Sequence, residues 1–201
     1  MALLDLLLVA AWLGLVVAVP SAVHYRRTGQ PPIRRSGRPA GPARWVGVFT
    51  VIGIALAIAA PLAELAGLPP FRPLDGSLIR WIGVAFVVGG VIATLTAQAA
   101  MGESWRGDVD PDARTDLITS GPFRLVRNPI LTSGTVVQVG LALVVPNVVS
   151  AAMLISFFAA IEIQVRLVEE PYLLRVHGDA YRAYASRTGR FVPGVGKLQS
   201  H

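Results

Sequence analysis

Charged residues recur at helical spacing within an apolar stretch near residue 165. Arg166 follows Glu162 by four residues, and Glu169 and Glu170 follow Arg166 by three and four residues. A helix would therefore place Glu162, Arg166 and one of the two later glutamates on one face. Ionisable side chains inside a membrane span are costly and need a partner or a water-filled site. Two interpretations follow: an ion-pair ladder that ends a helix at the interface, or the polar wall of a ligand cavity. We favour the cavity, because Gln138 supplies a further polar group in a neighbouring apolar stretch.

The residue types present exclude several chemistries. The chain has no Cys, which rules out disulfides, thiolate metal sites and cysteine nucleophiles. Its three His are too scattered for a metal site, and the aspartates from Asp108 onward fail the EF-hand pattern at Ala113 and Thr119, so we predict no metal. No GxGxxG or P-loop sequence opens a helix, which argues against a Rossmann-type nucleotide site. A cofactor would therefore bind between the membrane helices and their cytoplasmic extensions.

The elements that must position these residues are membrane helices. The 201 residues are 53% hydrophobic and only 15% charged, with a mean hydropathy of +0.58, which is too apolar for an ordinary soluble domain. The net charge of +6 comes from Arg residues beside apolar segments. That placement favours membrane orientation and attraction to anionic lipid over nucleic-acid binding. We therefore expect the lipid bilayer, and no nucleic acid, as a partner.

Five apolar runs are long enough to cross a bilayer, whose core of about 30 Å needs roughly 20 residues. They cover residues 2–19, 45–66, 78–100, 129–145 and 148–168. We interpret the first as a retained span that ends at Pro20, because its basic residues follow the apolar stretch. Only Pro146 and Asn147 separate the last two runs, which predicts a helical hairpin. The expected fold class is an all-α polytopic bundle of about five transmembrane helices, followed by a C-terminal cytoplasmic interfacial helix over residues 171–184.

The basic residues predict the orientation of the chain. Sixteen of the 18 fall in loops that five spans place on one face, leaving Arg72 and Arg80 on the other. By the positive-inside rule, the N-terminus lies outside and the C-terminus in the cytoplasm. Nearly all the basic residues are Arg, which suggests a bacterial protein, so we expect an integral protein of the bacterial plasma membrane. Residues 1–100 would form the N-terminal helices and a basic cytoplasmic loop, and residues 101–201 the cofactor-binding region with the hairpin.

Three motifs follow one another in the second half of the chain. Residues 121–129 read GPFRLVRNP, the pair Glu169 and Glu170 follows the hairpin, and residues 178–184 read GDAYRAY. This ordered set, over about residues 101–193, resembles the isoprenylcysteine carboxyl methyltransferase family. That family lies within the wider group of integral-membrane methyltransferases that includes phospholipid methyltransferases.

The chain departs from the pattern of that family at a few positions. Asn128 replaces the family's His, and Phe123 and Leu131 replace Tyr. Ser133 stands where the family has Gly, with Gly134 one place later. The amide of Asn128 can still donate and accept hydrogen bonds, so methyl-donor binding stays chemically feasible.

The resemblance implies a methyltransferase that uses S-adenosylmethionine. The acidic pair would bind the ribose hydroxyls or the amino group of this cofactor, and Arg127 or Arg124 would pair with its carboxylate. Which Glu takes which group stays open. The cofactor-binding residues implied in this way are Arg124, Leu125, Arg127, Asn128, Pro129, Glu169, Glu170 and Tyr181. The catalytic candidates are Arg127, Asn128, Glu162 and Arg166.

The expected acceptor is a lipophilic small molecule or prenylated substrate that enters beside the third, fourth or fifth helix. A carboxylate fits best, since it is already ionised at neutral pH, whereas an amine would need Glu162 or Glu170 as a general base. Gly134 and Gly140 could let a hydrocarbon tail approach, although small residues more often serve helix packing. Two alternatives stay open: an NADPH-dependent reductase of a lipid or sterol-like substrate, because the scaffold also resembles sterol reductases, and a non-catalytic lipid-binding membrane subunit.

Overall fold

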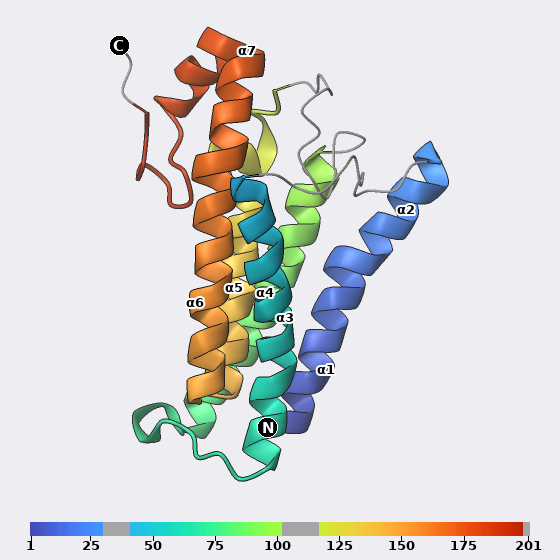
Figure 1. The fold of residues 1–201 in the computed structure, drawn as a ribbon, viewed down its shortest axis with the longest axis vertical. Coiled ribbons are helices and arrows are strands. Elements are labelled where there is room, and N and C mark those ends of the chain that lie inside the picture. Colours follow the sequence, from blue (N-terminus) through green and yellow to red (C-terminus); the bar gives the residue numbers. More distant parts are fainter. Residues whose placement is uncertain (30–40, 102–116, 199–201) are drawn as a thin grey trace.

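The computed structural model describes residues 1–29, 41–101 and 117–198, and the structural statements below concern those residues (Figure 1). Within them the chain folds into helices, and its strand-like pairing is limited to an isolated bridge between Val126 and Gly189. The all-α fold class is confirmed. The aspartates at 108–116 and residues 30–40 of the basic loop lie outside the described residues.

Most of the described chain belongs to membrane helices. Four helical stretches in it are long and apolar enough to cross a bilayer, namely Ala2–Arg26, Pro42–Leu65, Ser77–Met101 and Val148–Ala185, and the shorter apolar helix Pro129–Val144 is the fifth of the expected set. The first stretch comprises α1 (Ala2–Trp12), the π-helical η1 (Leu13–Ala18) and α2 (Val19–Thr28), and α3 (Pro42–Leu65), the short η2 (Arg72–Leu74) and α4 (Ser77–Met101) follow. The second half holds η4 (Gly121–Arg124), α5 (Pro129–Val144), α6 (Val148–Ile163), the π-helical η5 (Gln164–Glu169) and α7 (Glu170–Ala185). The chain is an integral membrane protein.

The first helix does not end at Pro20, and that expectation is wrong. Helical structure continues to Thr28 and stops at Gly29, whose φ of 68° is left-handed. Pro20 lacks the N–H that would donate to the carbonyl of Val16 in an α-helix. The side-chain Nε2 of Gln98, on α4, donates to that carbonyl instead, at 3.0 Å. A hydrogen bond from a neighbouring helix thus compensates for the proline, as membrane helices allow.

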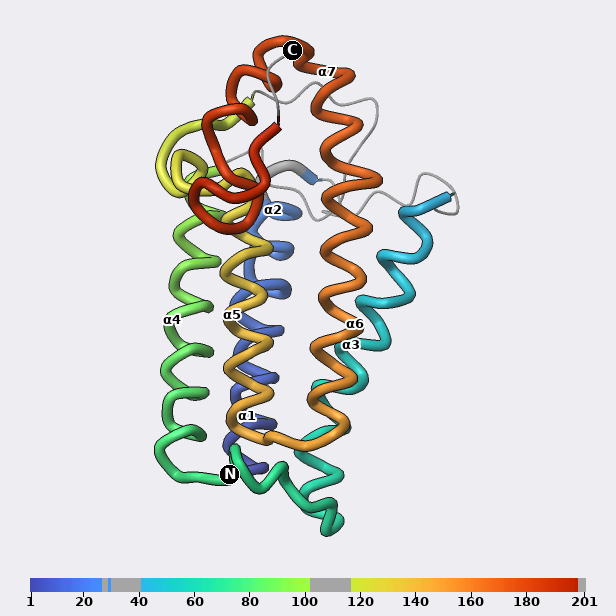
Figure 2. Tube along the Cα trace, turned by 90° about the vertical axis from the view of Figure 1, so that its left-hand side faces the viewer, coloured from blue at the N-terminus to red at the C-terminus, as the bar shows by residue number. Residues whose placement is uncertain are grey.

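The helices form a bundle that contains two closely packed pairs, each made of one helix from the first half of the chain and one from the second (Figure 2). The pair α4 and α5 contact along their length, as do α3 and α6, while α1 packs on α3 and reaches α5. Glycines bring α4 and α5 together: a Cβ added to Gly140 would lie 2.7 Å from the carbonyl oxygen of Gly83. The hydroxyls of Thr94 and Ser133 also meet across this contact at 2.8 Å.

The expected hairpin at Pro146 and Asn147 is present. Asn147 caps α6, because its side-chain oxygen accepts from the backbone N–H groups of Val149 and Ser150. Its Nδ2 donates to the carbonyl of Ala60 on α3 at 2.9 Å. From this turn α5 and α6 diverge toward the end of the bundle that carries α7 (Figure 2).

The last helix differs from the expectation of a separate interfacial segment. Helical structure runs without interruption from α6 through η5 into α7, and the backbone leaves helical geometry only at Gly178, where φ is 51°. Pro171 sits in the first turn of α7, where its missing N–H costs nothing. As a result, the charged residues of η5 and of α7 before Gly178 are held on one continuous helix that leaves the bundle.

Candidate functional site

The motif GPFRLVRNP lies at the end of the bundle that carries α7, where it joins η4 to α5 (Figure 1). Backbone hydrogen bonds tie it to the segment after α7: the N–H of Arg127 donates to the carbonyl of Gly189 at 2.8 Å, and that of Asn128 to Arg190 at 3.2 Å. The hydroxyl of Tyr184 donates to the carbonyl of Phe123 at 2.6 Å. Two of the three sequence motifs therefore contact each other directly.

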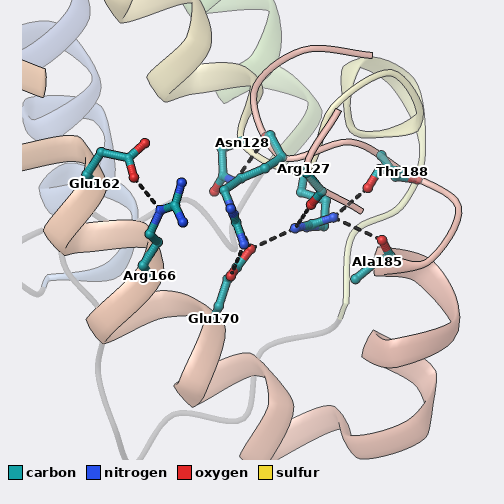
Figure 3. Close-up of polar contacts among 9 residues, drawn as sticks. Arg127, Asn128, Glu162, Arg166, Glu170, Ala185 and Thr188 are labelled. Carbon is teal, nitrogen blue, oxygen red and sulfur yellow. Dashed lines mark hydrogen bonds and ion pairs between the residues drawn. The ribbon is translucent and has the colours of Figure 1, made fainter. Parts of the chain in front are cut away.

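Arg127 is the most deeply buried cation of this region, with a side chain only 1% exposed. Its guanidinium donates to the carbonyls of Ala185, Thr188 and Gly196 at 3.0, 2.5 and 3.0 Å (Figure 3). It also donates to Oε1 of Glu170 at 2.7 Å. A buried guanidinium needs this many acceptors, so Arg127 fixes the segment after α7 against the motif.

Glu170 completes this contact through a second cation, Arg190. Nε of Arg190 donates to Oε1 of Glu170 at 2.8 Å, and Nη2 donates to Oε2 at 2.9 Å. Donation of these hydrogen bonds to the Glu170 carboxylate raises the pKa of the Arg190 guanidinium, although partial burial opposes the rise. Arg190 was not among the residues expected from the sequence, because it lies beyond the three motifs and follows a turn without helical periodicity.

Glu162 and Arg166 form an ion pair one helical turn apart, at the junction of α6 and η5 (Figure 3). Their side chains are 42% and 55% exposed, so this pair is far more open than the Arg127–Glu170 pair. The charge of Glu162 acts on Arg190 as well. Asn128 is half-buried, and its Nδ2 donates to the carbonyl of Arg190 at 3.2 Å. Of the four expected catalytic candidates, Asn128 thus contacts Arg190 directly and Arg127 shares the Glu170 carboxylate with it, whereas Arg166 pairs with Glu162.

The remaining cofactor candidates divide into buried and exposed residues. Tyr181 is 1% exposed and packs against Tyr184, with ring centroids 6.2 Å apart. Oε1 of the partly buried Glu169 accepts a hydrogen bond from Gln164 at 2.7 Å. Pro129 is buried at the first turn of α5. Arg124, the last residue of η4, and Leu125, which follows it, are exposed, and neither takes part in the hydrogen bonds of Glu170 described above.

An apolar groove lies between α4, η4 and α5. It holds about 350 Å³ and is lined by residues 89–96 of α4, 122–126 around η4 and 129–136 of α5. The hydroxyls in its wall are turned to backbone carbonyls: Thr96 donates to Ile92, Thr132 to Phe191 and Ser133 to Pro129. The groove therefore presents carbon atoms, which suit a hydrocarbon chain.

The fold and the site thus describe an integral membrane protein with a polar motif folded at one end of its helices, and a sequence comparison assigns it to a family. Residues 78–180 match the phospholipid methyltransferase family, and because the match covers half of the chain, the protein belongs to that family. The matched region begins in α4 and ends in α7, so it contains the groove, the motif and the acidic pair.

One curated relative is the nickel-cobalt-cadmium resistance protein NccN of Alcaligenes xylosoxydans xylosoxydans. It is 28% identical over 121 residues, which is 60% of this chain and 55% of the relative. The chain therefore spans little more than half the length of that protein. No solved structure matches the chain.

Proposed function

We propose that the protein transfers a methyl group from S-adenosylmethionine to a lipophilic acceptor, most favourably an isoprenylcysteine-like carboxylate. The observation that carries the proposal is the gathering of Asn128, the Glu162–Arg166 pair and the acidic pair at one end of the membrane helices, within the region that matches the methyltransferase family. The donor is water-soluble and the acceptor apolar, so a site at the bilayer surface serves both.

The residues present suit the chemistry of the donor. When bound, S-adenosylmethionine supplies a methyl carbon on a sulfonium sulfur, and that carbon passes to the acceptor oxygen as the carbon–sulfur bond breaks. Glu169 uses one oxygen for Gln164, which leaves the other for the donor's amino group or ribose hydroxyls. Arg166 is open enough to pair with the donor's carboxylate.

Arg127 and Glu170 take a positioning role in this proposal. The Nη atoms of Arg127 and both carboxylate oxygens of Glu170 are already engaged with each other, with Arg190 and with backbone carbonyls. They hold the segment after α7 against Asn128, which keeps the amide of Asn128 beside Arg190. Alignment of this kind is what methyl transfer to an ionised carboxylate requires, because no proton has to be removed.

Binding of S-adenosylhomocysteine to the purified protein in detergent tests the proposal. We expect binding by the wild type, and Glu169→Gln should weaken it by about 10- to 100-fold, the equivalent of about 1.5–3 kcal/mol for a hydrogen bond to a charged group. Asp179→Asn is the matched control, because the carboxylate of Asp179 is 96% exposed and lies on the outer part of α7. Binding of NADPH instead would indicate a reductase, and binding of neither ligand would indicate a lipid-binding subunit.

A further inference from the structure

Gln138 is a buried polar side chain in the middle of α5 that the site described above does not use. It is 3% exposed, and its amide makes no hydrogen bond with any described residue, Oε1 being fully enclosed. Its helical neighbours on the same face, Leu141 and Ala142, belong to the apolar core together with Trp12 and Phe157. A buried amide without partners is unfavourable, and such groups in native proteins call for an explanation.

Several other buried polar side chains of the bundle make at least one hydrogen bond within the protein. The hydroxyls of Thr94, Ser133 and Ser156 donate to the carbonyls of Gly90, Pro129 and Phe49 at 2.8 Å each. Gln98 uses its amide nitrogen to replace the N–H that Pro20 lacks. Gln138 therefore differs from the polar residues around it, because it has no structural task in the described contacts.

The face of α5 that carries Gln138 also has free space one turn away. Gly134 precedes Gln138 by four residues, so both lie on one face of the helix. A Cβ added to Gly134 would meet no atom within 4 Å, whereas one added to Gly140 or Gly90 would lie within 3 Å of α4 or of Val137. Gly134 thus leaves space that helix packing does not fill.

From the level of Asn128, the N-cap of α5, this face runs along the helix into the membrane. Gly134 is six residues and Gln138 ten residues beyond Asn128, which correspond to about 9 and 15 Å along an α-helix. An α-helix turns 100° per residue, so the face with Gly134 and Gln138 points away from the face of Ser133 and Gly140 that contacts α4. In addition, α5 separates from α6 toward the end of α5 at which Asn128 lies (Figure 2). A chain-like ligand with its reacting end near Asn128 could pass Gly134 and reach Gln138.

We propose that Gln138 binds a neutral oxygen of the lipophilic acceptor, a hydroxyl or carbonyl roughly 15 Å from the methylated atom along the helix axis. The inference rests on the proposed methyltransferase function and specifies its acceptor class. An uncharged amide offers one acceptor and two donors, so it recognises a hydroxyl or carbonyl and gives no advantage to a plain hydrocarbon chain. The acceptor is thus an apolar chain with a second polar group in its interior.

The first test is the stability of the protein in detergent. Gln138→Met keeps the length of the side chain and removes the unpaired amide, so the midpoint of thermal unfolding should rise by about 2–4 °C. The matched variant Gln98→Met should lower it, because it removes the hydrogen bond to Val16. A fall of the midpoint in Gln138→Met would show that the amide serves the fold, and would overturn the proposal.

The second test compares octadecanoic acid with 12-hydroxyoctadecanoic acid as methyl acceptors, using S-adenosylmethionine labelled in the methyl group. The wild type should prefer the hydroxy acid by about 5- to 10-fold in kcat/KM, the usual effect of one added hydrogen bond. Gln138→Met should lose this preference while keeping its affinity for S-adenosylhomocysteine. Equal use of both acids by the wild type, or a preference that persists in Gln138→Met, would contradict the proposal.

Two further outcomes separate this inference from the function on which it rests. A wild type that binds S-adenosylhomocysteine but methylates neither acid overturns the role of Gln138 and leaves the methyltransferase proposal standing. A wild type that does not bind S-adenosylhomocysteine overturns the methyltransferase proposal itself.

The variant Ala93→Leu tests the other possible location of the acceptor chain, because Ala93 lines the apolar groove beside α4. If Ala93→Leu loses the preference for the hydroxy acid while Gln138→Met keeps it, the acceptor chain lies in that groove and the inference is overturned.

Discussion

Arg190 holds both carboxylate oxygens of Glu170, through Nε at 2.8 Å and Nη2 at 2.9 Å. Arg127 donates to the same carboxylate at 2.7 Å, so one anion that is 9% exposed serves two guanidinium groups. These three residues come from the motif, the start of α7 and the segment after it. The ion cluster therefore connects the parts of the chain that form the candidate site.

Removing the shared anion should destabilise the protein strongly. Glu170→Gln leaves the buried Arg127 without its counter-charge, and breaking a buried pair in this way costs about 3–5 kcal/mol. We expect a lower free energy of unfolding and faster proteolysis of residues 186–198 in detergent. Thermal unfolding and limited proteolysis followed by mass spectrometry measure the two effects.

Glu162→Gln is the control for that variant. The Glu162–Arg166 pair is half-exposed, and exposed pairs contribute about 0–1 kcal/mol. Its unfolding should therefore stay close to that of the wild type. Equal destabilisation by the two variants would show that burial does not distinguish the two ion pairs.

The contact between Gln98 and Val16 should depend on Pro20. Gln98→Leu removes the donor to the Val16 carbonyl and should cost about 1–3 kcal/mol of stability, the penalty for an unpaired buried group. Pro20→Ala restores a backbone N–H, so the same Gln98 change should cost less in that background. A double-mutant cycle of unfolding free energies measures the difference, and additive effects would refute the compensation.

The two glycines of α5 should respond oppositely to alanine. Gly140→Ala places a Cβ 2.7 Å from the backbone of α4, and overpacking of this kind costs about 1–3 kcal/mol. Gly134→Ala meets open space and should gain up to about 1 kcal/mol from helix propensity. Unfolding midpoints of the two variants in one detergent compare them directly, and a destabilised Gly134→Ala would show that its surroundings are filled.

The topology of the membrane helices gives a further prediction. The N-terminus and α7 lie at opposite ends of the bundle (Figure 1), and the positive-inside rule assigns the end with α7 to the cytoplasm. A reporter fused after His201 should therefore be cytoplasmic, and one fused before Met1 external. Fluorescence and alkaline phosphatase fusions read out the two compartments, and both reporters on one side would contradict the orientation.

The fold was predictable because hydrophobic length is a strong signal in membrane proteins. The hairpin at Asn147 also followed from spacing, since two residues leave no other connection. The end of the first helix did not, because proline marks a helix end only when no other helix supplies the missing hydrogen bond. That donor, Gln98, lies 82 residues beyond Val16, whose carbonyl accepts the hydrogen bond.

The candidate site was predictable in its residue types more than in their pairing. The motifs indicated Arg127 and Glu170, but sequence spacing could not show that their charges would meet each other. Arg190 gave no signal, because its role arises from the turn after α7 that returns the chain to the motif. Gln138 stood out as a polar residue in an apolar run, and only the structure shows that it has no partner.

The return of residues 186–198 to the motif has a consequence for biosynthesis. The apolar helices can enter the membrane one after another as the ribosome makes them, but Arg127 waits for acceptors at Ala185, Thr188 and Gly196. The candidate site therefore matures after all the membrane helices have been synthesised. A nascent chain arrested between Glu170 and Ala185 would carry an inserted bundle in which Arg127 has its counter-charge but lacks these three carbonyl acceptors, which is a form that quality-control proteases could recognise.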